Sequence, residues 1–151
     1  MSKKIIAFDM DGTIADLYAV KDWLPKLMAE DESPYREARP MWNMAELRRI
    51  LIRLAGKGWE IRVISWLSKG ASRQYKEKIR IAKREWLRKY NFPAEKVHLV
   101  EYGTTKADCI RKHAEVAILI DDNKKVRHGW HLGRTIDPQE VDILEELKKL
   151  I

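Results

Sequence analysis

Residues 5–13, Ile-Ile-Ala-Phe-Asp-Met-Asp-Gly-Thr, decide the fold that we predict for this chain. The apolar run 5–8 is typical of a strand buried in a sheet. Asp9 and Asp11 follow at the end of that strand, and Gly12 allows the backbone to turn sharply. Because buried carboxylates are costly without a positive partner, this pattern indicates a divalent cation or a phosphate-binding cradle. An Asx-turn that closes an ordinary strand is the alternative interpretation.

Length and composition place the chain among globular proteins. It has 151 residues, of which 45% are hydrophobic and 35% charged, as expected for one domain with a sizeable core and a very polar surface. No apolar stretch approaches the ~20 residues of a membrane-spanning helix, so we expect no membrane partner. Residues 1–4 lack the features of a signal peptide, and Cys109 is the only cysteine. We therefore expect a cytoplasmic protein without an internal disulfide.

The charge of the chain narrows the class of partner without choosing one. A formal net charge of +7 favours anionic partners. Nucleotides, nucleic acid and acidic proteins all meet that description, so the choice among them rests on the site residues. The sequence leaves the oligomeric state open.

Short apolar stretches alternate with segments of helical periodicity along the chain. Strands are predicted at 5–8, 61–65, 97–100 and 116–120, with a weaker one at 134–136. Helices are predicted at 17–30 with a kink near Pro25, at 44–55, 72–90 and 105–113, and from Asp137 onward. Turn signals at Ser33-Pro34 and Arg39-Pro40 mark 31–43 as irregular. Repeated β-α units with apolar strands predict an α/β fold, a three-layer Rossmann-like parallel sheet with helices on both faces.

Polar residues gather at the predicted strand ends, where open parallel sheets bind their ligands. They are Asp9 and Asp11 after the first strand, Ser65 at the end of the second, Asp121 and Asp122 after the fourth, and Lys106 shortly after the third. Phosphoryl transfer through an aspartyl-phosphate needs this set: a carboxylate nucleophile, an acid/base partner, phosphate-neutralising donors and Mg²⁺ ligands. Ordinary strand-end and helix-start side chains are the alternative interpretation for Ser65 and Lys106.

These motifs resemble those of the haloacid dehalogenase (HAD) superfamily of phosphohydrolases, over nearly the whole chain. Residues 9–13 match the family's DxDGT signature, and Ser65, Lys106 and the pair Asp121-Asp122 match the other three motifs. The stretches 8–16, 65–66 and 120–122 are most similar to the small 5′(3′)-deoxyribonucleotidase-like members. The resemblance implies one HAD-like hydrolase domain over residues 1–151, with a small helical cap inserted at about 17–43.

The resemblance also implies a role for each matched position. Asp9 would attack phosphorus and carry the phosphoryl group, and Asp11 would protonate the leaving oxygen and then activate water. The expected phosphate-binding residues are Ser65, Lys106, Trp66, Gly12 and Thr13. The expected ligands of a Mg²⁺ cofactor are Asp9, Asp11 through its backbone carbonyl, Asp121 and Asp122; which of the last two binds directly stays open, with Asp121 favoured.

The implied function is Mg²⁺-dependent hydrolysis of a small phosphomonoester, with nucleoside monophosphates as the expected substrates. The expected cap carries Arg36 and several aromatic residues. The aromatic side chains near the site are suited to holding a base: Trp23, Tyr35, Trp42 and Trp66. Packing within a compact cap is the alternative role for each of them. The histidines at 98, 113, 128 and 131 are expected to be surface or packing residues.

Two other functions stay open at this point. The predicted helix 72–90 carries eight lysines and arginines, which would suit a phosphatase of nucleic-acid ends. A solvated basic face, in which we include Lys83, is the competing interpretation of that helix. The second alternative is a HAD-like binding module without catalysis, although the intact acidic residues speak against it.

Overall fold

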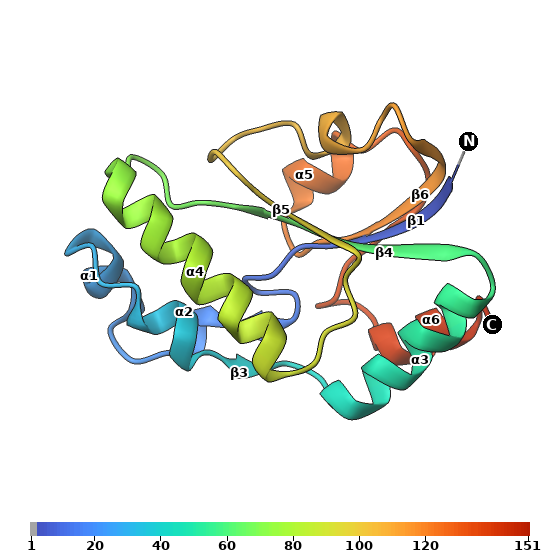
Figure 1. Ribbon diagram of the computed structural model, residues 1–151, viewed down its shortest axis with the longest axis horizontal. Coiled ribbons are helices and arrows are strands. Elements are labelled where there is room, and N and C mark those ends of the chain that lie inside the picture. The colour runs from blue at the N-terminus through green and yellow to red at the C-terminus, as the bar shows by residue number, and fades with distance from the viewer. Residues whose placement is uncertain (1–2) are drawn as a thin grey trace.

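A five-stranded parallel sheet forms the centre of the computed structural model, which describes residues 3–151 (Figure 1). Its strands lie in the order β5-β4-β1-β6-β7. The strand bounds are β1 (Lys3–Phe8), β4 (Trp59–Trp66), β5 (Lys96–Val100), β6 (Ala114–Ile120) and β7 (Thr135–Ile136). Each neighbouring pair runs parallel, so the carboxyl ends of the strands meet at one edge. All five predicted strands are confirmed.

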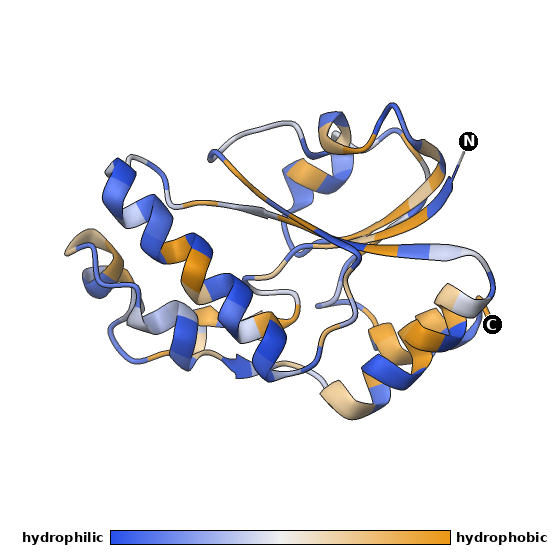
Figure 2. Ribbon diagram, in the orientation of Figure 1, coloured by the Kyte–Doolittle hydropathy of each residue, from blue (hydrophilic) through white to orange (hydrophobic). Residues whose placement is uncertain are grey.

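Three helices cover one face of this sheet. Ile6 and Phe8 of β1 point into that layer and share one core cluster with Leu51 and Trp86. The helices are α3 (Met44–Gly56), α4 (Arg73–Lys89) and α6 (Ile143–Lys148). Asn43 and Ser72 cap the first two by accepting hydrogen bonds from backbone N–H groups of their first turns. Figure 2 shows α4 as hydrophilic over most of its length, with a hydrophobic band in its middle.

Shorter elements cover the opposite face. Ile5 and Ala7 pack there against Ile110 and Trp130. The covering elements are the 3₁₀ turn η2 (Lys106–Cys109) and α5 (Lys124–His128). Helices α3, α4 and α6 lie on one side of the strands in Figure 1 and α5 on the other. The predicted three-layer α/β fold is thus confirmed. No helix within residues 3–151 is long and apolar enough to cross a membrane.

A small helical insertion begins and ends at a short antiparallel ribbon. Strand β2 (Ala15–Asp16) pairs with β3 (Arg39–Pro40), which brings the two ends of the insertion together. Between them lie η1 (Leu17–Ala19), α1 (Trp23–Met28) and α2 (Ser33–Glu37). Tyr35 of α2 packs against Tyr75 and Ile79 of α4. Helix α4 therefore links the insertion to the sheet.

The insertion differs from its predicted secondary structure. The expected helix 17–30 is divided, because Val20 is extended and Asp22 has a positive φ of 57°. Pro25 lies in the first turn of α1, where a missing N–H removes no hydrogen bond, so it does not kink that helix. Ser33-Pro34 opens helix α2 for the same reason and is not a turn.

Two helices near the C-terminal half are shorter than predicted. The segment 105–113 forms only η2, followed by turns. The last helix begins at Ile143, not near Asp137. The Asp137 carboxylate accepts from the Gln139 N–H and closes a local turn, whereas Asp142 is the N-cap and accepts from the Leu144 N–H.

The segment 61–65 is predicted to be an apolar strand, but strand β4 contains a buried arginine in this segment. Arg62 is buried and donates two hydrogen bonds to Glu60 Oε2, at 2.9 and 2.7 Å. Its other guanidinium nitrogen lies 3.3 Å from His98 Nε2 on β5. These contacts satisfy the buried charge of Arg62, so we interpret Arg62 as a residue that packs within the sheet. The other three histidines are exposed, as predicted.

Candidate active site

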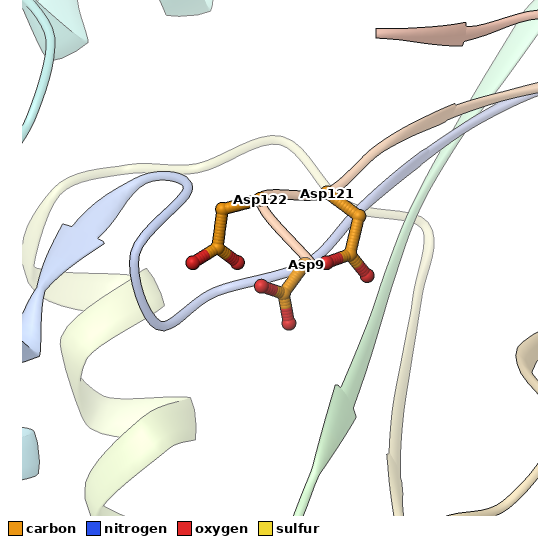
Figure 3. A group of neighbouring side chains, drawn as sticks. All are labelled: Asp9, Asp121 and Asp122. Carbon is orange, nitrogen blue, oxygen red and sulfur yellow. The ribbon is translucent and has the colours of Figure 1, made fainter. Parts of the chain in front are cut away.

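The carboxylates of Asp9, Asp121 and Asp122 converge where β1 and β6 end (Figure 3). One oxygen of each lies within 4.8 Å of the others. The Asp9 N–H donates to the Ile120 carbonyl at 2.9 Å, which holds the two strand tips side by side. The parallel pairing of β1 with β6 thus brings together carboxylates that lie more than a hundred residues apart.

Lys106 bridges two of these carboxylates. Its Nζ lies 3.0 Å from Asp9 Oδ1 and 2.7 Å from Asp121 Oδ2. Burial lowers the pKa of Lys106, but the attraction of the two carboxylates outweighs burial, so its pKa lies above the ordinary value. Lys106 is therefore protonated and neutralises part of the cluster.

Asp11 is held apart from that cluster. Its Oδ2 lies 3.0 Å from the Nζ of Lys83, which comes from α4. Burial raises the pKa of Asp11, against the attraction of Lys83, which lowers it. A carboxyl with a raised pKa is suited to donate a proton. The side chain of Asp11 thus lies outside the group formed by Asp9, Asp121 and Asp122, and a metal contact through its backbone carbonyl stays a prediction.

The prediction for Lys83 was wrong. We expected a solvated position on the basic helix, but its side chain is 1% exposed and also reaches Ser65 Oγ at 2.7 Å and the Trp66 carbonyl at 2.9 Å. The sequence carries a signal for this placement. Lys83 is four residues after Ile79 and three before Trp86, so it falls on the buried stripe of α4.

Gly12 and Thr13 shape the turn between the carboxylates. Gly12 has a φ of +78°, and a Cβ there would lie 2.3 Å from Asp122 Oδ2. Thr13 is fully buried; its Oγ1 donates to Asp9 Oδ2 at 3.1 Å and accepts from the Asp122 N–H at 3.2 Å. The N–H groups of both residues donate to backbone carbonyls of the turn, and neither residue lines the cavity. We therefore propose them as residues that position carboxylates, in place of the predicted phosphate contact.

A cavity of about 530 Å³ opens next to the four aspartates, which all contribute to its lining. Asp9, Asp11, Ser65 and Lys106 lie at its polar end. Its walls are mainly aromatic and aliphatic: Leu17, Tyr18, Trp23, Leu24, Leu27, Met28, Tyr35, Trp66, Leu67 and Tyr102. Its size and its composition are typical of a site for a small organic molecule.

Not every residue predicted near the substrate reaches this cavity. Trp23 and Trp66 line it, and so does Tyr35, whose ring is largely buried and whose hydroxyl pairs with Ser68. Trp42 instead donates from Nε1 to the Thr13 carbonyl at 2.7 Å and supports the turn. Arg36 forms an ion pair with Glu85 on the surface of α4.

The residues at the strand tips fit a Mg²⁺ ion. Four carboxylates face two lysines, and burial together with the charge of Asp9 raises the pKa of Asp121 to about 6 and of Asp122 to about 8. Raised pKa values here mean that the negative charge is not fully compensated by the protein. Mg²⁺ prefers carboxylate oxygens in a small octahedral shell, which Asp9, Asp121 and Asp122 would supply.

Comparison with known proteins extends the description of the fold. No protein-family model and no curated protein matches the chain. Among solved structures, the fold is similar to that of D,D-heptose 1,7-bisphosphate phosphatase from Burkholderia thailandensis, with a TM-score of 0.58 and 12% sequence identity over 97% of each chain. At this identity the similarity shows the fold alone, and it agrees with the predicted three-layer α/β architecture.

The raised pKa values of Asp121 and Asp122 predict a pH-dependent stability of the metal-free protein. A carboxyl whose pKa is higher in the folded than in the unfolded chain stabilises the fold fully only below the unfolded value, near pH 4, and loses that effect as the pH rises. In EDTA the melting temperature should therefore fall between about pH 5 and pH 8. Mg²⁺ should raise it more at pH 8 than at pH 5, because more of its ligands are deprotonated at the higher pH.

Asp122→Asn is the matched variant for this measurement, because it keeps the shape and removes the titration. The melting temperature is measured against pH for both proteins, and the variant's curve is subtracted from that of the wild type. This difference removes the contribution of other groups, including His98, whose lowered pKa acts in the opposite direction. Parallel pH dependences of wild type and Asp122→Asn in EDTA would contradict the assignment.

Proposed function

We propose that this protein is a Mg²⁺-dependent phosphomonoesterase that acts through an aspartyl-phosphate, and that nucleoside monophosphates are its substrates. The observation that carries the proposal is the division of roles at the polar end of the cavity. Asp9 lies in the carboxylate cluster beside Lys106, while Asp11 is held separately by Lys83. A nucleophile and an acid/base group therefore face the same space without sharing a partner.

The chemistry follows from these positions. An Asp9 oxygen forms a bond to phosphorus as the bond to the leaving oxygen breaks, and Asp11 gives its proton to that oxygen. Water then attacks phosphorus, Asp11 takes up a proton, and the bond to Asp9 breaks to release inorganic phosphate. Lys106 and Ser65, which both line the cavity, would hold phosphate oxygens in both steps. Mg²⁺, when bound, reduces the repulsion between the phosphate and Asp9.

The walls of the cavity are suited to a leaving group that has a planar, weakly polar part. Tyr18 and Trp23 form an edge-to-face pair with ring centroids 4.9 Å apart, and Trp66 and Tyr102 form a second pair at the same distance. Tyr18, Leu24, Met28 and Tyr102 are each about half exposed or more, which is unusual for large apolar side chains unless they contact a ligand. A nucleoside base would be such a ligand, because its flat face can stack on these rings.

The direct test is hydrolysis of a substrate panel by the purified protein. It contains nucleoside 5′- and 3′-monophosphates, sugar phosphates and 3′-phosphorylated oligonucleotides. We expect release of phosphate from nucleoside monophosphates with Mg²⁺ and none after addition of EDTA, because the clustered carboxylates would then repel the substrate. Full activity in EDTA would contradict the metal requirement. A preference for oligonucleotides would favour the nucleic-acid-end alternative, and no turnover of any ester would favour a binding module.

Asp9→Asn should abolish turnover while the protein stays folded, because an amide cannot form the acyl phosphate. The metal-free variant should melt at a higher temperature than the wild type, since one negative charge leaves a crowded cluster. Beryllofluoride, which imitates an acyl phosphate, should bind the wild type with Mg²⁺ and fail to bind the variant. Near wild-type turnover by Asp9→Asn would remove Asp9 from the mechanism.

Asp11→Asn should lower turnover of a nucleoside monophosphate by about 10²–10⁴-fold, the usual contribution of general acid–base catalysis. Its Mg²⁺ affinity, measured by calorimetry, should stay within a few-fold of the wild type, because the Asp11 carboxylate pairs with Lys83 outside the cluster. An unchanged rate would rule out the acid/base role.

A further inference from the structure

Lys83 is a fully buried cation for which the sequence predicted no role at the site. An ammonium group has three N–H donors, and the Nζ of Lys83 uses one on each of three acceptors. These are Asp11 Oδ2 at 3.0 Å, Ser65 Oγ at 2.7 Å and the Trp66 carbonyl at 2.9 Å. Lys83 does not line the cavity, and the Tyr35 ring lies 5.0 Å from its Nζ. It therefore has no donor left for a substrate.

We propose that Lys83 is a positioning residue that prepares both Asp11 and Ser65 for phosphoryl transfer. It does so by fixing which oxygen of Asp11 carries the proton and which way the Ser65 hydroxyl donates. The proposal rests on the phosphatase function proposed above and adds to it a residue that acts through others.

The hydrogen bond from Lys83 also distinguishes the two oxygens of Asp11. An ammonium N–H can only donate, so Asp11 Oδ2 accepts from Lys83. Because the carbonyl oxygen of a carboxylic acid is a better acceptor than its hydroxyl oxygen, Lys83 favours Oδ2 as the carbonyl oxygen and the proton on Oδ1. Asp11 lines the cavity, and Oδ1 has no partner among the side chains of residues 3–151. Lys83 thus leaves the acidic proton on the oxygen that is free to meet the leaving group.

The same reasoning applies to Ser65. Its Oγ accepts from Lys83, so its own hydrogen cannot point toward that lysine. The hydroxyl is then available as a donor in the cavity, where a phosphate oxygen would be an acceptor. The third bond, to the Trp66 carbonyl, holds the end of β4 against α4 and fixes the backbone that carries Ser65.

Lys83→Met tests the proposal, because it keeps length and apolar stem but removes charge and donors. Lys78→Met, an exposed position on the same helix, is the matched control. Turnover is compared for two substrates, thymidine 5′-monophosphate and 4-nitrophenyl phosphate. The first releases an alkoxide that needs the proton of Asp11, whereas 4-nitrophenolate leaves without one.

We expect Lys83→Met to lower kcat for thymidine 5′-monophosphate by about 10²-fold, as a catalytic group misplaced by about 1 Å does. The loss for 4-nitrophenyl phosphate should be at least tenfold smaller, so the ratio of the two kcat values changes. Lys78→Met should leave both values unchanged. Lys83→Arg keeps the charge and the donors, and it should keep the wild-type ratio even where both rates fall.

Mg²⁺ binding, measured by calorimetry, separates this role from a structural one. Removing a positive charge near four carboxylates should leave the Mg²⁺ affinity of Lys83→Met unchanged or higher, whereas a disordered site would bind Mg²⁺ weakly. Equal losses for both substrates, or a weakened affinity for Mg²⁺, would overturn the positioning role and leave the phosphatase function intact. A wild-type protein that hydrolyses neither substrate would refute the phosphatase function and the role of Lys83 with it.

Discussion

The structure depends on the balance between four aspartates and two buried lysines at the carboxyl edge of the sheet. Each buried charge would be costly alone, and three of the four aspartates are paired with a lysine. Lys106 bridges Asp9 and Asp121, while Lys83 binds Asp11. Two lysines leave the cluster negative, which is why a divalent cation suits it. The same pairing keeps the Asp11 carboxylate, the proposed acid/base group, apart from the other three carboxylates.

This balance requires a particular backbone at the end of β1. The turn must pass close to Asp122, and the positive φ at Gly12 together with its missing Cβ permits that approach. Thr13 then ties Asp9 to the backbone of Asp122 through one hydroxyl. The DxDGT spacing is therefore a geometric requirement, because the glycine lets the turn pass close to Asp122 and the threonine binds both Asp9 and Asp122.

The parts of the fold that the sequence predicted well are those with strong periodicity. Apolar runs located the strands, and the rule that ligands bind at strand ends located Asp9, Asp11 and Asp121. The failures have a common cause, which is competition between local signals and tertiary contacts. Asp137 carries capping signals but closes a turn, and the charge of Lys83 suggests solvent although its position on the helical stripe places it inside. Its partners lie up to 72 residues away, so no local pattern could name them.

Helix α4 supports both the insertion and the Asp11 side chain. It carries Lys83, and it also holds the insertion: Tyr75 donates to the Asp31 carbonyl at 2.9 Å, and Trp86 donates to the Ala38 carbonyl at 2.8 Å. Tyr35 contacts both parts, since it lines the cavity and lies over the Lys83 ammonium. The insertion, which supplies part of the cavity wall, is therefore attached to the helix whose Lys83 binds Asp11. Under the proposed function, the walls that contact the leaving group and the residue that protonates it would share one support, and this would couple the choice of substrate to its chemistry.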